Sequence, residues 1–329
     1  MPFYYSVGKD DRVSSIFDFP PPMRVHAATV EQFEALIAEA LRRPHLPRRH
    51  CKLGAVLFTD DFDDGSLAGW TFLEGTKIRK RHKTGEFVWR DAVGYLWVGP
   101  DTVKDPKLEF HVTRDSKTGL FRGERHSTPV EFGVVNGRLR LRSHHYLHHI
   151  TAVTGDPEWT GYQVDVDMWK FRELPHPSGP TDYRKFGAYG RVSVPNFPFT
   201  RGEHSFVAVE IGNYANYDVS ERTWGDSAFQ IRCKYPEPVY LERDPSRILR
   251  YTQILDYIGF VVPEAMKMHL TARFTGRYVE GWIDDEKILE GEIPADHPGM
   301  GKGRIALWTF ETFAEFDNLK VTQLVEVDE

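Results

Sequence analysis

From residue 53 onward, apolar and polar residues alternate with a period of two, in short runs separated by turn signals. This alternation is typical of β-strands that bury one face and expose the other. The clearest case is Arg138–Ser143, in which leucines and arginines take turns directly after Asn136-Gly137, a strong hairpin signal. Neither an alternation of strands with helices nor an internal repeat is visible in the sequence. The pattern therefore predicts an all-β fold.

The strands expected from this alternation are short, and turn signals at Thr275-Gly276 and Asp284-Asp285 separate some of them. At 329 residues, the chain is long enough for one large β-domain or two smaller ones. The expected strands are Gly54–Phe58, Phe87–Trp89, Tyr95–Val98, Leu108–Val112, Arg138–Ser143, Tyr162–Trp169, Gly187–Val194, Ser205–Ile211, Ala228–Lys234, Tyr257–Val262, Met268–Thr275, Tyr278–Ile283, Lys287–Glu292, Arg304–Thr309 and Phe316–Gln323.

The N-terminal residues follow a different pattern. Thr29 and Gln32 have the spacing of a capping box, and apolar residues then recur at helical spacing until Pro44. This predicts one amphipathic helix over residues 29–43. Because a lone helix of this length is only marginally stable in water, we expect it to brace the β-domain or to lie at a subunit contact. The predicted division is thus an N-terminal extension, 1–52, and a β-domain, 53–329.

Charge and cysteine usage exclude some classes of partner. A formal net charge of -6 argues against nucleic acid as the main partner. Cys51 and Cys233 are too few for a disulfide framework and lack metal-site spacing, which favours free thiols in a reducing compartment. No apolar run reaches membrane-spanning length, and the first residues lack a signal-peptide pattern. We therefore expect a cytoplasmic protein, although a chain already trimmed of a leader would look the same.

Several short segments occur in an order that is typical of one superfamily. They are Phe58–Gly65 with Gly69-Trp70, Val134–Leu141, Trp159–Val164, Tyr278–Glu286, Gly303–Trp308 and Phe316–Val321. Their order resembles the concanavalin A-like lectin/glucanase superfamily, and within it the laminin-G-like domains of the 3-keto-disaccharide hydrolase family. The resemblance covers roughly residues 58–325. It implies a concanavalin A-like antiparallel β-sandwich, or jelly roll, that holds a carbohydrate on its concave sheet.

The same resemblance implies that the first and last strands meet at one edge, often around a structural calcium ion. Asp61 and Asp317 are the positions that match. The acidic run Asp60–Asp64 offers the hard oxygen ligands that Ca²⁺ prefers. The same residues are also typical turn formers, so a calcium site and a plain acidic turn both fit the sequence. No organic cofactor is expected.

One departure from the superfamily concerns catalysis. The laminarinase-type glycosidases of this fold carry Glu-x-Asp-x-x-Glu on one strand, and this sequence has no such motif. The usual paired-carboxylate mechanism of glycoside hydrolysis therefore lacks its groups. Phosphate-cradling glycine loops and the Gly-x-Ser-x-Gly elbow are absent as well, which argues against nucleotide chemistry and Ser-triad hydrolysis.

Alternation also sorts strand residues by face. The residues predicted to point away from the core are charged with both signs and include aromatic rings: Asp165, Asp167, Trp169, Tyr189, Arg191, Glu210, Gln230, Arg232 and Lys234. Carboxylates and guanidinium groups suit sugar hydroxyls, and flat rings stack on sugars. A solvated face with cross-strand ion pairs would have a similar composition. The resemblance favours the saccharide-binding interpretation, because relatives use this sheet.

Residues 144–149 contain four histidines beside Tyr146. A histidine such as His145, with a tyrosine nearby, is able to serve as base and acid in elimination or hydrolysis, and two histidines are able to hold a metal. A polar loop with capping hydrogen bonds is the alternative. The segment after the predicted strand Ser205–Ile211 adds stacking and hydrogen-bonding groups, namely Asn213, Tyr214 and Trp224.

The predicted function is a carbohydrate-active enzyme, either a glycoside hydrolase or a carbohydrate lyase. Glu210 is the expected general acid or base, with His145 or Tyr189 as its partner. Arg191 is expected to neutralise a carboxylate or a developing enolate. The excess of arginine on this face slightly favours an acidic or oxidised sugar. The residues expected to bind substrate are Asp165, Asp167, Trp169, Tyr146, His148, Asn213, Tyr214, Trp224, Arg232 and Lys234.

Two other functions fit the sequence. A non-catalytic, lectin-like glycan-binding module would use the same face for shallow stacking. An interaction protein would use the predicted helix at 29–43 to dock a partner. Nucleic acid and membranes are not expected partners, and a homo-oligomer is compatible with the sequence.

Overall fold

The computed structural model describes most of the β-domain and two short pieces before it. The described residues are 4–5, 23–24, 51–81, 87–98, 111–114, 116–118, 120–125, 128–143, 148–171, 185–193, 205–213, 227–234, 252–259, 266–295, 297, 301–310 and 312–327. In part of the strands only the backbone is described. The predicted helix at 29–43 lies outside the described residues, so the helix and the division at residue 52 stay predictions.

Every regular element within these ranges is a β-strand, which confirms the all-β class. Phe87–Trp89 and Tyr95–Val98, expected as two strands, belong to one strand. The described part contains no helix of the length and apolarity needed to cross a membrane. The strands are β1 Tyr4–Tyr5, β2 Met23–Arg24, β3 Cys51–Asp60, β4 Thr71–Arg81, β5 Phe87–Val98, β6 His111–Arg114, β7 Phe121–Arg125, β8 Thr128–Val135, β9 Arg138–Ser143, β10 His148–Thr154, β11 Tyr162–Phe171, β12 Lys185–Ser193, β13 Ser205–Asn213, β14 Ser227–Lys234, β15 Thr252–Gly259, β16 Lys267–Thr275, β17 Tyr278–Ile283, β18 Glu286–Glu292, β19 Arg304–Phe310 and β20 Phe313–Glu326.

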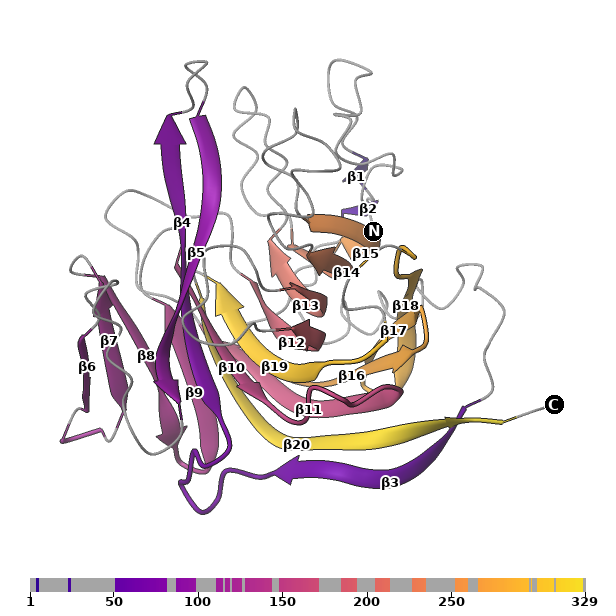
Figure 1. The fold of residues 1–329 in the computed structure, drawn as a ribbon, viewed down its shortest axis with the longest axis horizontal. Coiled ribbons are helices and arrows are strands. Elements are labelled where there is room, and N and C mark those ends of the chain that lie inside the picture. The colour runs from indigo at the N-terminus through magenta and orange to yellow at the C-terminus, as the bar shows by residue number, and fades with distance from the viewer. Residues whose placement is uncertain are drawn as a thin grey trace.

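β1 and β2 pair with each other, and the other strands form two large antiparallel sheets, which confirms the predicted sandwich (Figure 1). The inner sheet has eight strands in the order β15-β14-β13-β12-β19-β10-β4-β5. The outer sheet has ten strands in the order β18-β17-β16-β11-β20-β9-β8-β7-β6, with β3 also paired to β20. In Figure 1, β20, β11 and β16 curve around β19, β12 and β13. We call the surface of the inner sheet that points away from the outer sheet the concave face, and the opposite surface of the outer sheet the convex face.

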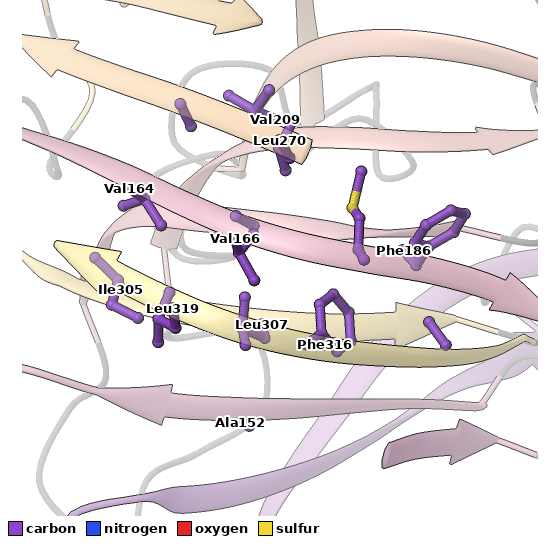
Figure 2. Close-up of a cluster of buried hydrophobic side chains, with 14 of the residues drawn as sticks. Ala152, Val164, Val166, Phe186, Val209, Leu270, Ile305, Leu307, Phe316 and Leu319 are labelled. Atoms are coloured by element: carbon purple, nitrogen blue, oxygen red, sulfur yellow. The ribbon is translucent and has the colours of Figure 1, made fainter. Parts of the chain in front are cut away.

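One apolar core fills the space between the sheets (Figure 2). Val164 and Leu270 enter it from the outer sheet, and Val209 and Leu307 enter it from the inner sheet. All four are fully buried, and each such side chain contributes about 1.5–3 kcal/mol of transfer free energy. Because side chains alternate along a strand, the neighbours of these residues face outward, and Glu210 next to Val209 faces the concave side.

Tight turns join successive strands as the sequence predicts. Asn136 and Gly137 have φ values of 53° and 71° between β8 and β9. Asp284 and Asp285 have φ values of 47° and 68° between β17 and β18. Positive φ at both central residues is what a type I′ turn requires, and its twist matches that of the flanking strands. Both predicted hairpins are therefore confirmed.

Candidate functional site

Aromatic side chains gather on the concave face. Tyr189 of β12 stacks on Phe206 of β13, with ring centroids 3.9 Å apart and an angle of 7° between the ring planes. Trp308 of β19 lies against the same tyrosine, with centroids 4.8 Å apart. Because β12 runs between β13 and β19, the three rings form a continuous platform across adjacent strands. They belong to a buried apolar cluster, here the concave cluster, made of Leu73, Val153, Tyr189, Val192, Phe206, Ala208, Ala306, Trp308 and Phe310.

A carboxylate with several cationic and amide partners adjoins this platform. Glu210 of β13 is fully buried. Arg232 of β14 donates from Nε to Glu210 Oε1 at 2.5 Å and from Nη2 to Oε2 at 3.0 Å. Gln230, the cross-strand neighbour of Glu210, donates from its Nε2 to Oε1. The Nζ atom of Lys185 lies 3.6 Å from the same oxygen.

These partners set the charge of Glu210. Burial on its own would raise the pKa of Glu210, because a carboxylate is poorly solvated in the interior. The positive charges of Arg232 and Lys185, followed by hydrogen bonds from Arg232 and Gln230, outweigh burial and lower the pKa below its ordinary value. Glu210 is thus ionised at neutral pH. It is suited to accept hydrogen bonds and poorly suited to donate a proton.

Arg232 connects the carboxylate to the aromatic platform. Its guanidinium lies 5.2 Å from the ring centre of Phe206 and 5.1 Å from that of Trp308, within cation–π range. Its Nη2 also donates to the hydroxyl of Tyr189 at 3.4 Å. The side chains of Arg232 and Lys185 are 12% and 17% exposed. They are the outermost members of the charged group, so a ligand would approach it from their side.

One acceptor in this group is unsatisfied. Gln230 is 1% exposed, and its Oε1 has no hydrogen-bond partner in the described part of the chain. Its orientation is fixed, because the Nε2 atom of the same amide donates to Glu210. An unpaired buried acceptor costs about 1–3 kcal/mol. A donor supplied by a ligand would remove that cost.

The structure brings Tyr189, Glu210, Gln230 and Arg232 together as the alternation predicts. Lys234 lies on the same face of β14, opposite Phe206, and is buried. His148 and Asn213 belong to β10 and β13, of which the backbone is described at these positions. The other predicted site residues lie outside the described residues, so their roles stay predictions: His145, Tyr146, Tyr214 and Trp224.

The prediction that Arg191 shares the concave face with Glu210 is wrong. The pairing of β12 with β13 changes register between Gly190 and Ser193, a β-bulge that turns Arg191 inward. Arg191 is fully buried, and its guanidinium lies 5.4 Å from the ring centre of Tyr162, which belongs to the outer sheet. Arg191 therefore occupies the space between the sheets and does not face a ligand on the concave side.

The prediction that Asp165, Asp167 and Trp169 join the same site is also wrong. Their strand, β11, pairs with β16 and β20 and belongs to the outer sheet. Their side chains point outward as expected, but onto the convex face. Trp169 stacks there under the guanidinium of Arg138, at 3.9 Å from its ring centre. The sandwich core separates these residues from Glu210.

The two aspartates form an ionic network around His269 of β16. His269 Nδ1 lies 2.8 Å from Asp167 Oδ1, and its Nε2 lies 3.8 Å from Asp165 Oδ1. Lys267 Nζ lies 2.6 Å from the second oxygen of Asp167. The carboxylate of Asp165, together with the hydrogen bond to Asp167, raises the pKa of His269 to about 9, against the opposing effect of burial. His269 is therefore protonated at neutral pH.

The predicted calcium ligands lie where β3 pairs with the last strand. Leu319 of β20 is opposite Asp60 of β3, so the first and last strands of the sandwich do meet. Asp61 Oδ1 accepts a hydrogen bond from the backbone N–H of Asp63 at 3.2 Å, as a turn former does. Within the described ranges, no group of three or more His, Cys, Asp or Glu side chains is placed to hold a metal ion. A calcium site at Asp61 and Asp317 stays a prediction.

Three members of the concave site were not singled out from the sequence: Phe206, Lys185 and Trp308. Phe206 shares the face of Glu210 by simple alternation along β13, so a signal was present. Lys185 and Trp308 reach the site because β12 and β19 are adjacent, with Gly187 opposite both Glu210 and Trp308. That adjacency joins residues far apart in the chain, and no local pattern predicts it.

Comparisons with known proteins found no matching family model and no matching curated protein. Among solved structures, the chain is similar to a Bacillus subtilis protein of unknown function with a galectin-like fold, at 12% identity and a TM-score of 0.44, covering 84% of this chain and 100% of that one. It is also similar to a carbohydrate-binding module from Bacillus subtilis (10% identity, TM-score 0.39, 58% and 91% covered). A third similar structure is an alginate lyase (8% identity, TM-score 0.40, 80% and 89% covered).

Proposed function

We propose that the concave face binds a saccharide. The observation that carries this proposal is the aromatic platform of Tyr189, Phe206 and Trp308, which Arg232 joins to the ionised carboxylate of Glu210. Sugar rings present apolar C–H faces that stack on aromatic rings, and hydroxyls that both donate and accept hydrogen bonds. A site of this kind needs rings beside a few fixed polar groups. The concave face combines both. The three rings are only 3–4% exposed, so a sugar would meet the more exposed Arg232 and Lys185 first.

The unsatisfied acceptor supports the same ligand class. Gln230 Oε1 calls for a hydrogen-bond donor, because it is a buried acceptor with no partner among the described residues. Hydroxyl groups supply such a donor, whereas a purely apolar ligand would leave the acceptor unpaired. A saccharide therefore satisfies more of this site than an apolar ligand of equal size.

Binding is better supported than hydrolysis. A glycoside hydrolase needs a protonated acid near neutral pH, and Arg232 and Lys185 hold the pKa of Glu210 below its ordinary value. A carboxylate that two cations keep ionised is a weak proton donor. Membership of the 3-keto-disaccharide hydrolase family, which the order of sequence segments suggests, stays a proposal.

A carbohydrate lyase is the second candidate, and one contact favours it. The Tyr189 hydroxyl accepts a hydrogen bond from Arg232 Nη2 at 3.4 Å. A tyrosine hydroxyl held in place by an arginine is able to act as the base in an elimination. In that case Tyr189 removes the proton from the ring carbon next to the carboxylate of a uronate. A carbon–carbon double bond forms as the neighbouring bond to the glycosidic oxygen breaks, and that oxygen takes up a proton from water or from the protonated Tyr189.

The test of saccharide binding is titration calorimetry against neutral and uronate oligosaccharides. We expect Arg232→Lys to weaken binding at least tenfold, because lysine keeps the charge but loses the planar fork and the stacking. The matched control is Arg273→Lys on the convex face, where a guanidinium likewise stacks on a tryptophan, Trp282, at 4.4 Å. Equal affinities of the two variants would contradict the proposal.

The same samples separate binding from catalysis. Reducing ends report hydrolysis, and the ultraviolet absorbance of unsaturated products reports elimination. The binding proposal expects a constant signal in both assays. Steady production of unsaturated sugar, abolished in Tyr189→Phe, would establish the lyase instead.

A further inference from the structure

Arg191 lies in an unusual stretch of backbone directly after the aromatic platform. Its φ is 55°, in the left-handed region that non-glycine residues rarely adopt. The register of β12 shifts here against both neighbours, between Gly190 and Ser193 toward β13 and between Tyr189 and Val192 toward β19. A bulge that interrupts both edges of a strand costs hydrogen bonds as well as backbone strain, so other contacts must stabilise it.

The guanidinium of Arg191 supplies those contacts. Its Nη1 donates to the carbonyl oxygen of Gly301, and its Nη2 donates to those of Phe274 and Gly276, at 3.4 Å each. Its backbone N–H donates to the Tyr162 hydroxyl at 2.6 Å. No carboxylate is among the described contacts of this buried cation. Arg191 thus acts as a clamp that ties the bulge of the inner sheet to the β16–β17 turn of the outer sheet.

The residues around the bulge pack so closely that two nearby glycines, Gly190 and Gly303, have no room for a side chain. A Cβ atom on Gly190 would lie 2.4 Å from the ring of Phe274. A Cβ atom on Gly303 would lie 2.5 Å from the carbonyl carbon of Arg191. Real Cβ atoms do not approach other atoms so closely. The bulged backbone is therefore packed as tightly as the core around it.

The bulge changes which residues reach the concave face. Regular alternation would place Tyr189 and Arg191 on one face, and Gly190 and Val192 on the other. In the structure Gly190 and Arg191 both point inward, and Val192 joins Tyr189 and Phe206 in the concave cluster. The inward turn of Arg191 thus replaces a charged side chain at the end of the platform by an apolar one.

We propose that Arg191 is a positioning residue for the concave site, and that it acts through the bulge without touching the ligand. By clamping three carbonyl groups it holds Val192 in the cluster that contains the stacked rings of Tyr189 and Phe206, and it fixes the end of β12 next to Tyr189. This inference rests on the proposed saccharide function of that face.

The test compares Arg191→Gly with Leu270→Ala. Glycine tolerates the left-handed backbone, so Arg191→Gly removes the clamp without adding strain. Leu270→Ala is the control, because it removes a core side chain of the outer sheet that is not among the hydrogen-bond partners of Arg191. Two measurements are made well below the unfolding midpoint of each variant: saccharide affinity by calorimetry, and nuclear Overhauser effects from the methyl groups of Val192 to the concave aromatic rings.

We expect Arg191→Gly to weaken saccharide binding at least tenfold and to lose the contacts of Val192 with the rings, while Leu270→Ala keeps both. The inference is overturned if Arg191→Gly binds within twofold of the wild type, whatever its loss of stability. If the wild type binds no saccharide, the proposed function fails, and the Val192 contacts then decide alone: contacts retained in Arg191→Gly overturn the positioning role.

Discussion

Glu210 and His269 lie at the centres of two of the ionic networks of the sandwich, one on each outer surface. Glu210 is fully buried and bonded to a guanidinium that also covers aromatic rings, so its charge is fixed within an apolar setting. The side chain of His269 is 34% exposed and lies between two carboxylates. The first network offers fixed hydrogen-bond acceptors next to stacking rings. The second is a partly exposed ion cluster in which His269 has a carboxylate partner on each side, an arrangement typical of ion pairs that stabilise a fold.

At the residue scale, the charge of His269 predicts a pH dependence of stability. Its folded-state pKa of about 9 lies above the ordinary value for an unfolded chain. The charge of His269 therefore contributes fully to the free energy of unfolding below pH about 6.5, and this contribution is lost as the pH rises through about 9. Because the side chain is a third exposed, solvent screening reduces the effect to about 1–2 kcal/mol.

The measurement is the free energy of unfolding in urea for the wild type and for His269→Gln. We expect the advantage of the wild type over the variant to shrink by about 1–2 kcal/mol between pH 6 and pH 9.5. An advantage that stays constant across this range would show that His269 does not carry the charge assigned to it.

At the element scale, turns and strands differ in how far the sequence predicts them. Asn136-Gly137 and Asp284-Asp285 mark their hairpins, because few residues accept positive φ at two successive positions. The bulge in β12 has a weaker signal, namely Gly190 inside a strand-like run that also contains Gly187. Assigning alternate residues to opposite faces assumes a strand without a bulge. The one extra residue in the bulge of β12 was therefore enough to place Arg191 on the wrong face.

The close packing around Gly190 predicts that a larger residue there destabilises the fold. Gly190→Ala would place a methyl group against the Phe274 ring, and overpacking of this kind costs about 1–3 kcal/mol. The control is Gly301→Ala, where an added Cβ meets nothing within 4 Å; we expect it to change stability by less than about 0.5 kcal/mol. Urea unfolding of both variants is the measurement, and equal effects would contradict the packing described for the bulge.

At the scale of the whole molecule, the sandwich separates residues that look alike in sequence. Asp165 on β11 and Glu210 on β13 both follow the outward phase of their strands, yet they lie on opposite surfaces because their strands belong to different sheets. Alternation along one strand is local and predicts the inward or outward direction of a side chain. Sheet membership depends on pairing between distant segments, which a single sequence does not reveal. For this reason the fold and the Tyr189–Arg232–Glu210 group were predictable. The separation of the predicted site residues onto two opposite surfaces was not.

The most direct test of the account is fluorine NMR of the protein labelled with fluorotryptophan, titrated with the saccharide that calorimetry selects. Tryptophan-to-phenylalanine variants assign the resonances of Trp308 on the concave face and of Trp169 and Trp282 on the convex side. If the saccharide binds to the concave face, the Trp308 resonance shifts with the ligand and saturates at the calorimetric affinity, while the other two stay in place. A shift of Trp169 or Trp282 with Trp308 unchanged would place the ligand on the opposite surface and contradict the concave saccharide site.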